Sequence, residues 1–493
     1  MKKQISVYEV SVAIIIVIAY LFFPNNNPLN DSVHYAAAVK WGADLFDSHH
    51  LLYKSFNFCI YGIVKFFFYN ADAIKVMSLV NALFALASLW LLRKIVKNNI
   101  LVLFVAACFG VMRFAVEAET YIIPIFFSLL ASWFYLRFLL MRRALYLFFC
   151  GTFICIACLF HQIHLFWAIG LFAGVLMTGG ARFRNLAVFV LPALLVPITY
   201  SLVLVFYLKE QLNLTNLIHF AASYYFSDSA ETSVGMLNIL ITPVTFFRTF
   251  FQVHGTIVQV LKLVPVFYAV IPLVLFLVFM FLIKFFKTVK LGKLRNAQQP
   301  ERNFILTHII IFILQFAFAF YSHGNSEFMV MLPFLLVIFI RSIFDFNIVA
   351  VKYITAAMLV WNFFFAVFPN NYFDYQNNKA LAEFVSQQPE KTFILKDKYA
   401  VEGAYLYQTG KIPDKLVNAY SEDNLKFIPD SSIVYTDVFS RKLPYNRVNF
   451  VGLESSKNLK FQNHIKHFSS DFGGFYIDEA IFAGHNRNLE GYE

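Results

Sequence analysis

The chain has 493 residues, of which 59% are hydrophobic and only 14% are charged, so it is more apolar than an ordinary soluble domain. The net charge of +11 does not indicate a nucleic-acid partner, because no basic cluster is interleaved with an aromatic motif and helical membrane proteins concentrate Lys and Arg in cytoplasmic loops. We therefore expect a multi-pass membrane protein that contacts membrane lipids. All cysteines lie in or beside apolar runs, which excludes a disulfide framework and a zinc signature: Cys59, Cys108, Cys150, Cys155 and Cys158.

The first element is an apolar run from about Val7 to Phe23, which follows Lys2 and Lys3. The stretch FFPNNNP behind it offers no small-residue cleavage site, so we predict a retained signal anchor. Further apolar runs give an all-α polytopic fold with about 11 transmembrane helices. The predicted helices lie at about residues 5–23, 74–92, 99–115, 120–140, 144–160, 163–179, 186–208, 257–283, 303–321, 328–341 and 349–368.

Basic residues fall in every second loop between these helices, which is the pattern expected when the N-terminus is cytoplasmic. Eleven spans would then place the C-terminus outside. The loops predicted to be cytoplasmic contain Arg93, Lys94 and Lys97; Arg142 and Arg143; Arg182 and Arg184; Lys284, Lys287, Lys290, Lys293, Arg295 and Arg302; and Arg341 and Lys352.

Two apolar segments agree with this alternation only if they do not span the membrane. The run Phe56–Tyr69 is short, contains Lys65 and precedes Asp72, so we predict a helix that lies in the interface. Residues 239–252 carry Arg248 near the middle, and we predict an interfacial or re-entrant segment there.

The composition changes after Phe368, and residues 369–493 read as a small soluble α/β domain on the extracytoplasmic side. The stretches TFILKD and SSIVYTD are strand-like, and VEGAYLYQTG is helix-like. The predicted domains are therefore a membrane domain, residues 1–368, with a first outer loop at about 24–73, and the soluble domain, residues 369–493.

Ionisable side chains cluster in the loops that this topology places outside. Such groups are costly near hydrocarbon unless they face water, protein or a ligand, so we predict one polar cavity at the outer leaflet. The candidates are Asp31, His34, Asp44, Asp47, His49 and His50 in the first outer loop, Glu117 and Glu119 in the next, His161 and His164 in HQIH, and His323 and Glu327.

Several of these residues also have an ordinary structural explanation. Asp31 could cap a helix that begins with SVHYAAAVKW, and His49 and His50 could lie among lipid headgroups. If HQIH is helical, both histidine rings lie on one face of the helix, and binding of a divalent metal such as zinc is one alternative for them. Glu117 and Glu119 could be interfacial and pair with Arg113.

The order of these features resembles the GT-C superfamily of integral membrane glycosyltransferases, which includes protein O-mannosyltransferases and aminoarabinose transferases. Many members carry Asp-Glu-x-x-Tyr in the first outer loop, and this chain has Asp31, Ser32, Val33, His34 and Tyr35 there. The resemblance implies a polyprenyl-phosphate sugar donor and a general base at Asp31. Serine replaces the glutamate of the motif, and His34, or Glu117 or Glu119 from the next loop, could substitute for it.

Sugar transfer from a lipid phosphate explains these residue types. A base must take the proton of the acceptor hydroxyl, and cations or donors must stabilise the leaving phosphate. The candidate donors are Lys54, Arg113, Arg248, His49 and His50. A single dominant carboxylate favours one direct displacement with inversion, and the outer domain would orient a glycan, lipid or protein acceptor.

Three other classes remain open from the sequence. A cell-envelope polysaccharide polymerase or ligase would also use polyprenyl-linked glycans, although it would be expected to carry outer-loop arginines. A secondary transporter would place its charges near the bilayer midplane, usually in repeated halves, and no repeat is visible. A membrane scaffold would need no clustered acids and histidines. The short loops and low cysteine content favour a bacterial inner membrane, although a lumenal site in the endoplasmic reticulum obeys the same charge rule.

Overall fold

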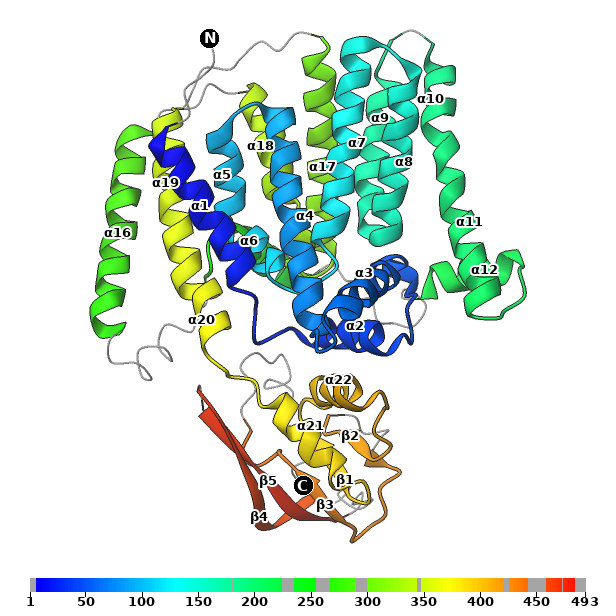
Figure 1. The fold of residues 1–493 in the computed structure, drawn as a ribbon, viewed down its shortest axis with the longest axis vertical. Helices are drawn as coiled ribbons and strands as arrows, with labels where there is room; N and C mark the ends of the chain where they lie inside the picture. The colour runs from blue at the N-terminus through cyan, green and yellow to red at the C-terminus, as the bar shows by residue number, and fades with distance from the viewer. Residues whose placement is uncertain are drawn as a thin grey trace, which may run out of the picture. The chain divides into compact units, whose positions relative to one another are not determined.

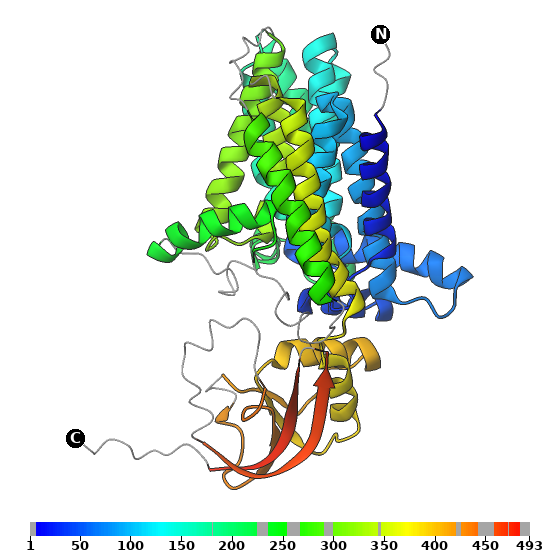
Figure 2. The same cartoon turned by 90° about the vertical axis from the view of Figure 1, so that its left-hand side faces the viewer.

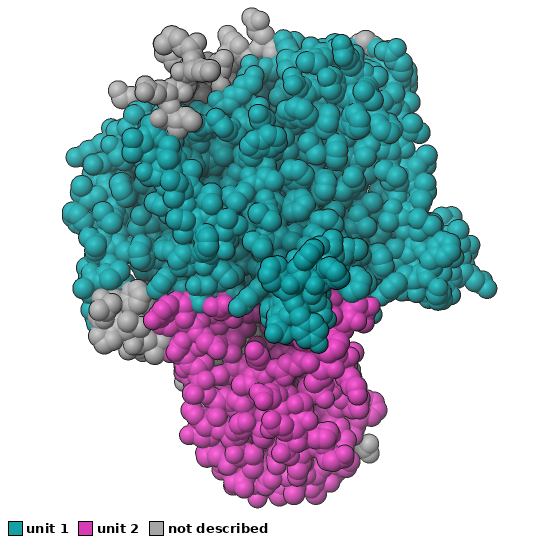
Figure 3. Space-filling view, viewed as in Figure 1, with its two compact units in different colours: residues 1–25, 44–371 teal, residues 26–43, 372–493 magenta. Residues whose placement is uncertain are grey.

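The computed structural model describes residues 6–179, 181–223, 235–253, 267–289, 299–343, 347–420, 425–441, 458–471 and 473–483. The chain divides into two compact units (Figure 3). Unit 1 contains residues 1–25 and 44–371, and unit 2 contains residues 26–43 and 372–493. The segment 26–43, which the sequence analysis assigned to the membrane domain, is therefore grouped with the C-terminal sheet.

Unit 1 is helical throughout its described part (Figure 1). Short 3₁₀ or π turns connect or extend several helices. The helices are α1 (Val7–Phe22), α3 (Tyr53–Phe67), α4 (Ala73–Val96), α5 (Asn99–Ala107), α6 (Phe109–Ala115), α7 (Ile122–Met141), α8 (Ala144–Phe160), α9 (Leu165–Leu176), α10 (Arg182–Val190), α11 (Leu195–Leu202), α12 (Leu214–Ala221), α14 (Met236–Phe250), α16 (Phe267–Thr288), α17 (Glu301–Tyr321), α18 (Leu332–Ile343), α19 (Ile348–Asn362) and α20 (Phe368–Tyr372).

Within the described residues, six helical segments are long and apolar enough to cross a membrane: 73–96, 122–141, 182–207, 268–288, 301–321 and 348–372. Four shorter apolar helices, at 7–22, 144–160, 162–176 and 327–340, correspond to other predicted spans. These segments make the chain an integral membrane protein. Only six of them are long enough to span a bilayer, so the predicted number of about 11 spans is not confirmed within the described residues.

One predicted helix is broken. The sequence predicted a single helix at 99–115, but α5 ends at Ala107 and α6 begins at Phe109. Cys108 between them has an extended backbone, with φ −64° and ψ 136°. An extended residue cannot continue the helical ladder of hydrogen bonds, so this apolar run is divided into two short helices.

The helices of unit 1 pack through aromatic and aliphatic side chains. A tight turn joins α7 to α8, because Arg142 at the C-cap of α7 adopts a left-handed backbone with φ 56°. Phe134 of α7 then stacks on Phe153 of α8, with ring centroids 5.4 Å apart. The long α16 packs on α19, where Ile271, Val274 and Val278 meet Ala357.

The short helix α3 lies across the direction of the long helices (Figure 2). Its C-terminal end exposes Ile63, Phe66 and Phe67, and exposed Phe68 and Tyr69 follow the helix. An amphipathic helix with an exposed apolar end suits the predicted position in the membrane interface, which stays a prediction.

Unit 2 is built around a five-stranded sheet with the order β2-β1-β3-β5-β4. The strand β1 pairs in parallel with β2 and β3, whereas β5 runs antiparallel to β3 and β4. The sheet predicted from TFILKD and SSIVYTD is therefore confirmed. The elements of unit 2 are α2 (Asn30–Trp41), α21 (Asn378–Ser386), β1 (Thr392–Leu395), α22 (Lys398–Thr409), β2 (Leu416–Asn418), β3 (Ile433–Thr436), β4 (Leu459–Ser470) and β5 (Gly473–Phe482).

The side chains of β1 alternate between two apolar clusters, as the pleat of a strand requires. Phe393 and Leu395 pack in a cluster with Leu381 of α21 and Val401 of α22. Ile394 enters the other cluster, on the opposite face of the sheet. Both faces of β1 are therefore buried, which explains its continuous apolar run.

Candidate functional site

The carboxylate of Asp31 is exposed and lies in the first turn of α2. Its Oδ1 accepts a hydrogen bond of 2.9 Å from the hydroxyl of Tyr399 on α22. Its Oδ2 accepts no hydrogen bond from the residues that the structure describes. The alternative that Asp31 caps a helix is wrong, because α2 already begins at Asn30 and the N-cap position is Leu29.

His34, on the same helix as Asp31, also contacts Tyr399. The two rings stack with centroids 4.1 Å apart and an interplanar angle of 16°. His34 Nε2 lies 3.0 Å from the backbone carbonyl oxygen of Tyr399, and a protonated Nε2 donates to it. The motif residue Tyr35 is half-buried on the same helix. Unit 2 thus brings Asp31 and His34 together around a tyrosine that the sequence analysis did not select.

In unit 1, four of the predicted histidines form a row. Ring centroids lie 4.0 Å apart for His49 and His50, 4.3 Å for His50 and His161, and 6.4 Å for His161 and His164. His50, His161 and His164 are buried. Residues from the predicted first outer loop and from the α8–α9 connection therefore meet.

The local geometry of HQIH differs from the prediction. His161 has an extended backbone at the end of α8, and His164 closes a separate 3₁₀ turn. The two rings therefore do not share one face of a continuous helix. Within the described ranges, no group of three or more His, Cys, Asp or Glu side chains is arranged to hold a metal ion.

The two HQIH imidazoles keep unused hydrogen-bonding atoms in the described part of the chain. His164 Nδ1 lies 2.6 Å from Ser128 Oγ on α7. The Nε2 atoms of His161 and His164 are buried and have no hydrogen-bond partner among the described residues. A buried polar atom without a partner is costly, so these atoms are suited to receive a polar group of a ligand.

Lys54 provides a nearly buried positive charge beside this row. Its Nζ forms an ion pair of 2.9 Å with Asp47 Oδ2. Burial lowers the pKa of His50 well below its ordinary value, and the charges of His161, His49 and Lys54 lower it further. His50 is therefore neutral at pH 7, and Lys54 carries the local positive charge.

The predicted acids Glu117 and Glu119 are buried in the α6–α7 connection. Asn25 Nδ2 donates to Glu117 Oε2. Asn81 of α4 donates to both backbone carbonyls, at 2.6 Å each. The alternative that the glutamates pair with Arg113 is wrong for the described chain, because the Arg113 guanidinium forms no ion pair and instead lies 5.1 Å from the ring of Phe114.

Glu327 is linked to the histidine row through Tyr121. The Tyr121 hydroxyl donates to Glu327 Oε2 at 2.8 Å, and the ring of Tyr121 lies 5.2 Å from that of His161. Arg248 lies over Phe109, 5.7 Å from the ring centroid. His323 follows α17 with a left-handed backbone, φ 54°. Contacts thus join Glu327 to the histidine row.

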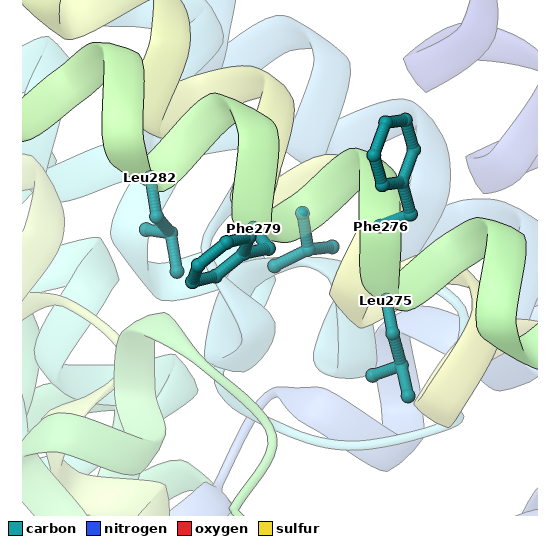
Figure 4. Close-up of a pocket in the computed structure, with 5 residues that line it drawn as sticks. Leu275, Phe276, Phe279 and Leu282 are labelled. Carbon is teal, nitrogen blue, oxygen red and sulfur yellow. The ribbon is translucent and has the colours of Figure 1, made fainter.

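An open apolar depression lies along α16 (Figure 4). It is lined by Leu275, Phe276, Val278, Phe279 and Leu282, all from this one helix. A surface of this kind suits contact with lipid chains and offers no polar group for a phosphate.

No protein-family model matches the chain. No curated protein matches it either. Among solved structures, the chain is similar to ArnT from Cupriavidus metallidurans in the apo state, with 9% identity over 96% of this chain and 97% of that chain and a TM-score of 0.40. The structure of the same protein bound to undecaprenyl phosphate covers the same shares, with 10% identity and a TM-score of 0.34.

Proposed function

We propose that this protein transfers a sugar from a polyprenyl-phosphate donor to an acceptor hydroxyl at the outer face of the membrane, with Asp31 as general base. The observation that carries the proposal is the state of the Asp31 carboxylate. It is exposed, one oxygen is fixed by Tyr399, and the other accepts no hydrogen bond from a described residue. A carboxylate in this state can accept the proton of an incoming hydroxyl.

The reaction is one direct displacement. The acceptor oxygen attacks the anomeric carbon, the bond from that carbon to the phosphate oxygen breaks, and the bonding pair leaves with the polyprenyl phosphate. The acceptor proton passes to Asp31. A single displacement inverts the anomeric centre, and a positioned base contributes on the order of 10² to 10⁴ in rate.

The donor phosphate is proposed to bind near Lys54 and the histidine row of unit 1. Lys54 supplies a nearly buried charge, now paired with Asp47, and His161 offers an unused buried Nε2. Fixed charges and N–H donors in a site of low polarity stabilise developing negative charge more strongly than water does.

The membrane body is proposed to hold the lipid tail of the donor, and the C-terminal domain to orient a glycan, lipid or protein acceptor. The apolar helices of unit 1 support the first part, because a polyprenyl chain partitions into hydrocarbon. We place the protein in a bacterial inner membrane because of its short loops and low cysteine content, and its N-terminus in the cytoplasm because of the alternation of basic loops.

The test is donor consumption by purified protein in proteoliposomes, with a panel of polyprenyl-phosphate sugars and mixed acceptors. Asp31→Asn should lower turnover by at least about a hundredfold while the protein remains folded. Asp430→Asn is the matched control, since Asp430 is an exposed aspartate of unit 2 that is not a candidate for the site, and it should turn over like wild type.

Two outcomes would contradict the proposal. Normal turnover of Asp31→Asn would remove its role as base. Consumption of no donor by the wild type would favour the polysaccharide polymerase or ligase class, or a transporter, and the same proteoliposomes can then be assayed for glycan elongation and for solute uptake.

A further inference from the structure

The two helices α2 and α22 of unit 2 contact each other along their lengths. Near their first turns Tyr399 contacts Asp31 and His34. Near their ends Lys40 Nζ donates to the backbone carbonyl of Tyr407 at 2.8 Å and lies 4.4 Å from the centroid of its ring. The proposed base is thus carried by a helix that the C-terminal unit holds at both ends.

We propose that Tyr399 is a positioning residue for the transferase reaction. Its hydroxyl fixes Oδ1 of Asp31, so that Oδ2 remains available to take the acceptor proton. The inference rests on the proposed function, because it assigns Tyr399 a role only through Asp31. It adds that a residue of the C-terminal domain, 368 positions away in sequence, sets the geometry of the base.

Two contacts with His34 hold Tyr399 in place. The ring of His34 stacks on the Tyr399 ring, and the same imidazole bonds the Tyr399 carbonyl. A tyrosine has few side-chain rotamers, so these two contacts leave its hydroxyl little freedom. The hydroxyl can therefore orient an exposed carboxylate that would otherwise rotate.

Gly403, one turn further along α22, permits this arrangement. A Cβ at residue 403 would lie 2.7 Å from Cδ2 and Nε2 of the His34 ring, which is closer than such atoms approach. The ring could not retreat without losing its stacking on Tyr399. Because Gly403 has no side chain, the His34 ring can lie against it and remain stacked on Tyr399.

A purely structural role for the Tyr399 hydroxyl predicts a different result. The bond to Asp31 is exposed, and exposed hydrogen bonds contribute little to the stability of the fold. If the hydroxyl only joined two helices, its removal would change neither the rate of the chemical step nor, appreciably, the melting temperature. If it positions the base, the rate falls while the fold is retained.

The experiment compares Tyr399→Phe with wild type in the full-length protein, in the proteoliposome assay. We expect kcat to fall roughly ten- to hundredfold, which corresponds to the loss of a hydrogen bond to a charged group, with KM for donor and acceptor unchanged. The melting temperature should stay at the wild-type value. Tyr405→Phe is the matched control, because Tyr405 lies on the same helix but packs against the sheet cluster, and it should have wild-type kcat.

Three results would overturn the inference. They are a wild-type kcat for Tyr399→Phe, a raised KM at constant kcat, which would make the hydroxyl a substrate contact, or a fall in melting temperature that accounts for the lost activity. The Asp31→Asn variant separates this failure from failure of the proposed function. If Asp31→Asn is inactive and Tyr399→Phe is normal, only the positioning role is lost, whereas normal turnover of Asp31→Asn removes both.

Discussion

A buried charged side chain in unit 2 is stabilised by hydrogen bonds and an ion pair. This side chain is that of Asp437, which follows β3 and is completely buried. Its Oδ1 accepts the backbone N–H of Lys396 at 2.8 Å, and its Oδ2 accepts Arg441 Nη1 at 3.0 Å. Burial raises the pKa of Asp437 above its ordinary value, although Arg441 and the hydrogen bonds act in the opposite direction.

This pKa predicts how stability depends on pH. Because the pKa of Asp437 is higher in the folded than in the unfolded state, its contribution to stability is complete below the ordinary aspartate pKa of 3.8. It is lost as the pH rises through the higher folded-state pKa. The melting temperature of wild type minus that of Asp437→Asn should therefore decrease as pH rises through this window. Thermal unfolding of the full chain in detergent at a series of pH values measures it.

The control for that measurement is Asp430→Asn, which removes an exposed carboxylate from the same unit and corrects for the loss of one negative charge. A difference between wild type and Asp437→Asn that grows as the pH rises would contradict the direction of the pKa shift.

At the scale of the elements, close approach of helix backbones determines the packing of unit 1. Gly151 of α8 faces α10, and a Cβ at this position would overlap the backbone carbonyl of Phe189. A backbone carbonyl inside a helix cannot move aside as the end of a flexible side chain can. Small residues at such crossings let membrane helices approach closely.

We therefore expect Gly151→Ala to lower the free energy of unfolding by about 1–3 kcal/mol, the usual cost of overpacking. Gly62→Ala on α3 is the control, because no atom lies within 4 Å of a Cβ at that position. Replacement of a helical glycine by alanine in open space should be neutral or stabilising by about 0.5–1 kcal/mol. Melting temperatures in detergent compare the two, and equal values would show that α8 and α10 separate without cost.

At the scale of the whole molecule, the loop charges predict an orientation in the membrane. The basic loops of the sequence alternate with loops that carry acids and histidines, and the latter supply the histidine row, Glu117 and Glu327 of unit 1. An arrangement with a cytoplasmic N-terminus would place all of these groups on the outer side.

A pair of fusion reporters tests this orientation in cells. A reporter enzyme that is active only outside the cytoplasm should be active after Glu493, and one that is active only in the cytoplasm should be active before Met1. The opposite pair of activities would show an odd number of spans with the reversed orientation, whereas both ends on one side would show an even number of spans.

The sequence by itself determined the membrane character, most helix positions and the C-terminal sheet, because hydropathy and charge are local properties of the chain. The tertiary structure decided the rest. It divided the run 99–115 at Cys108, separated the two HQIH rings, placed Arg113 over the ring of Phe114 and grouped α2 with the C-terminal sheet. Tyr399 could not be selected from the sequence, because its bond to Asp31 spans 368 positions and depends on how α2 and α22 pack, which no local pattern encodes.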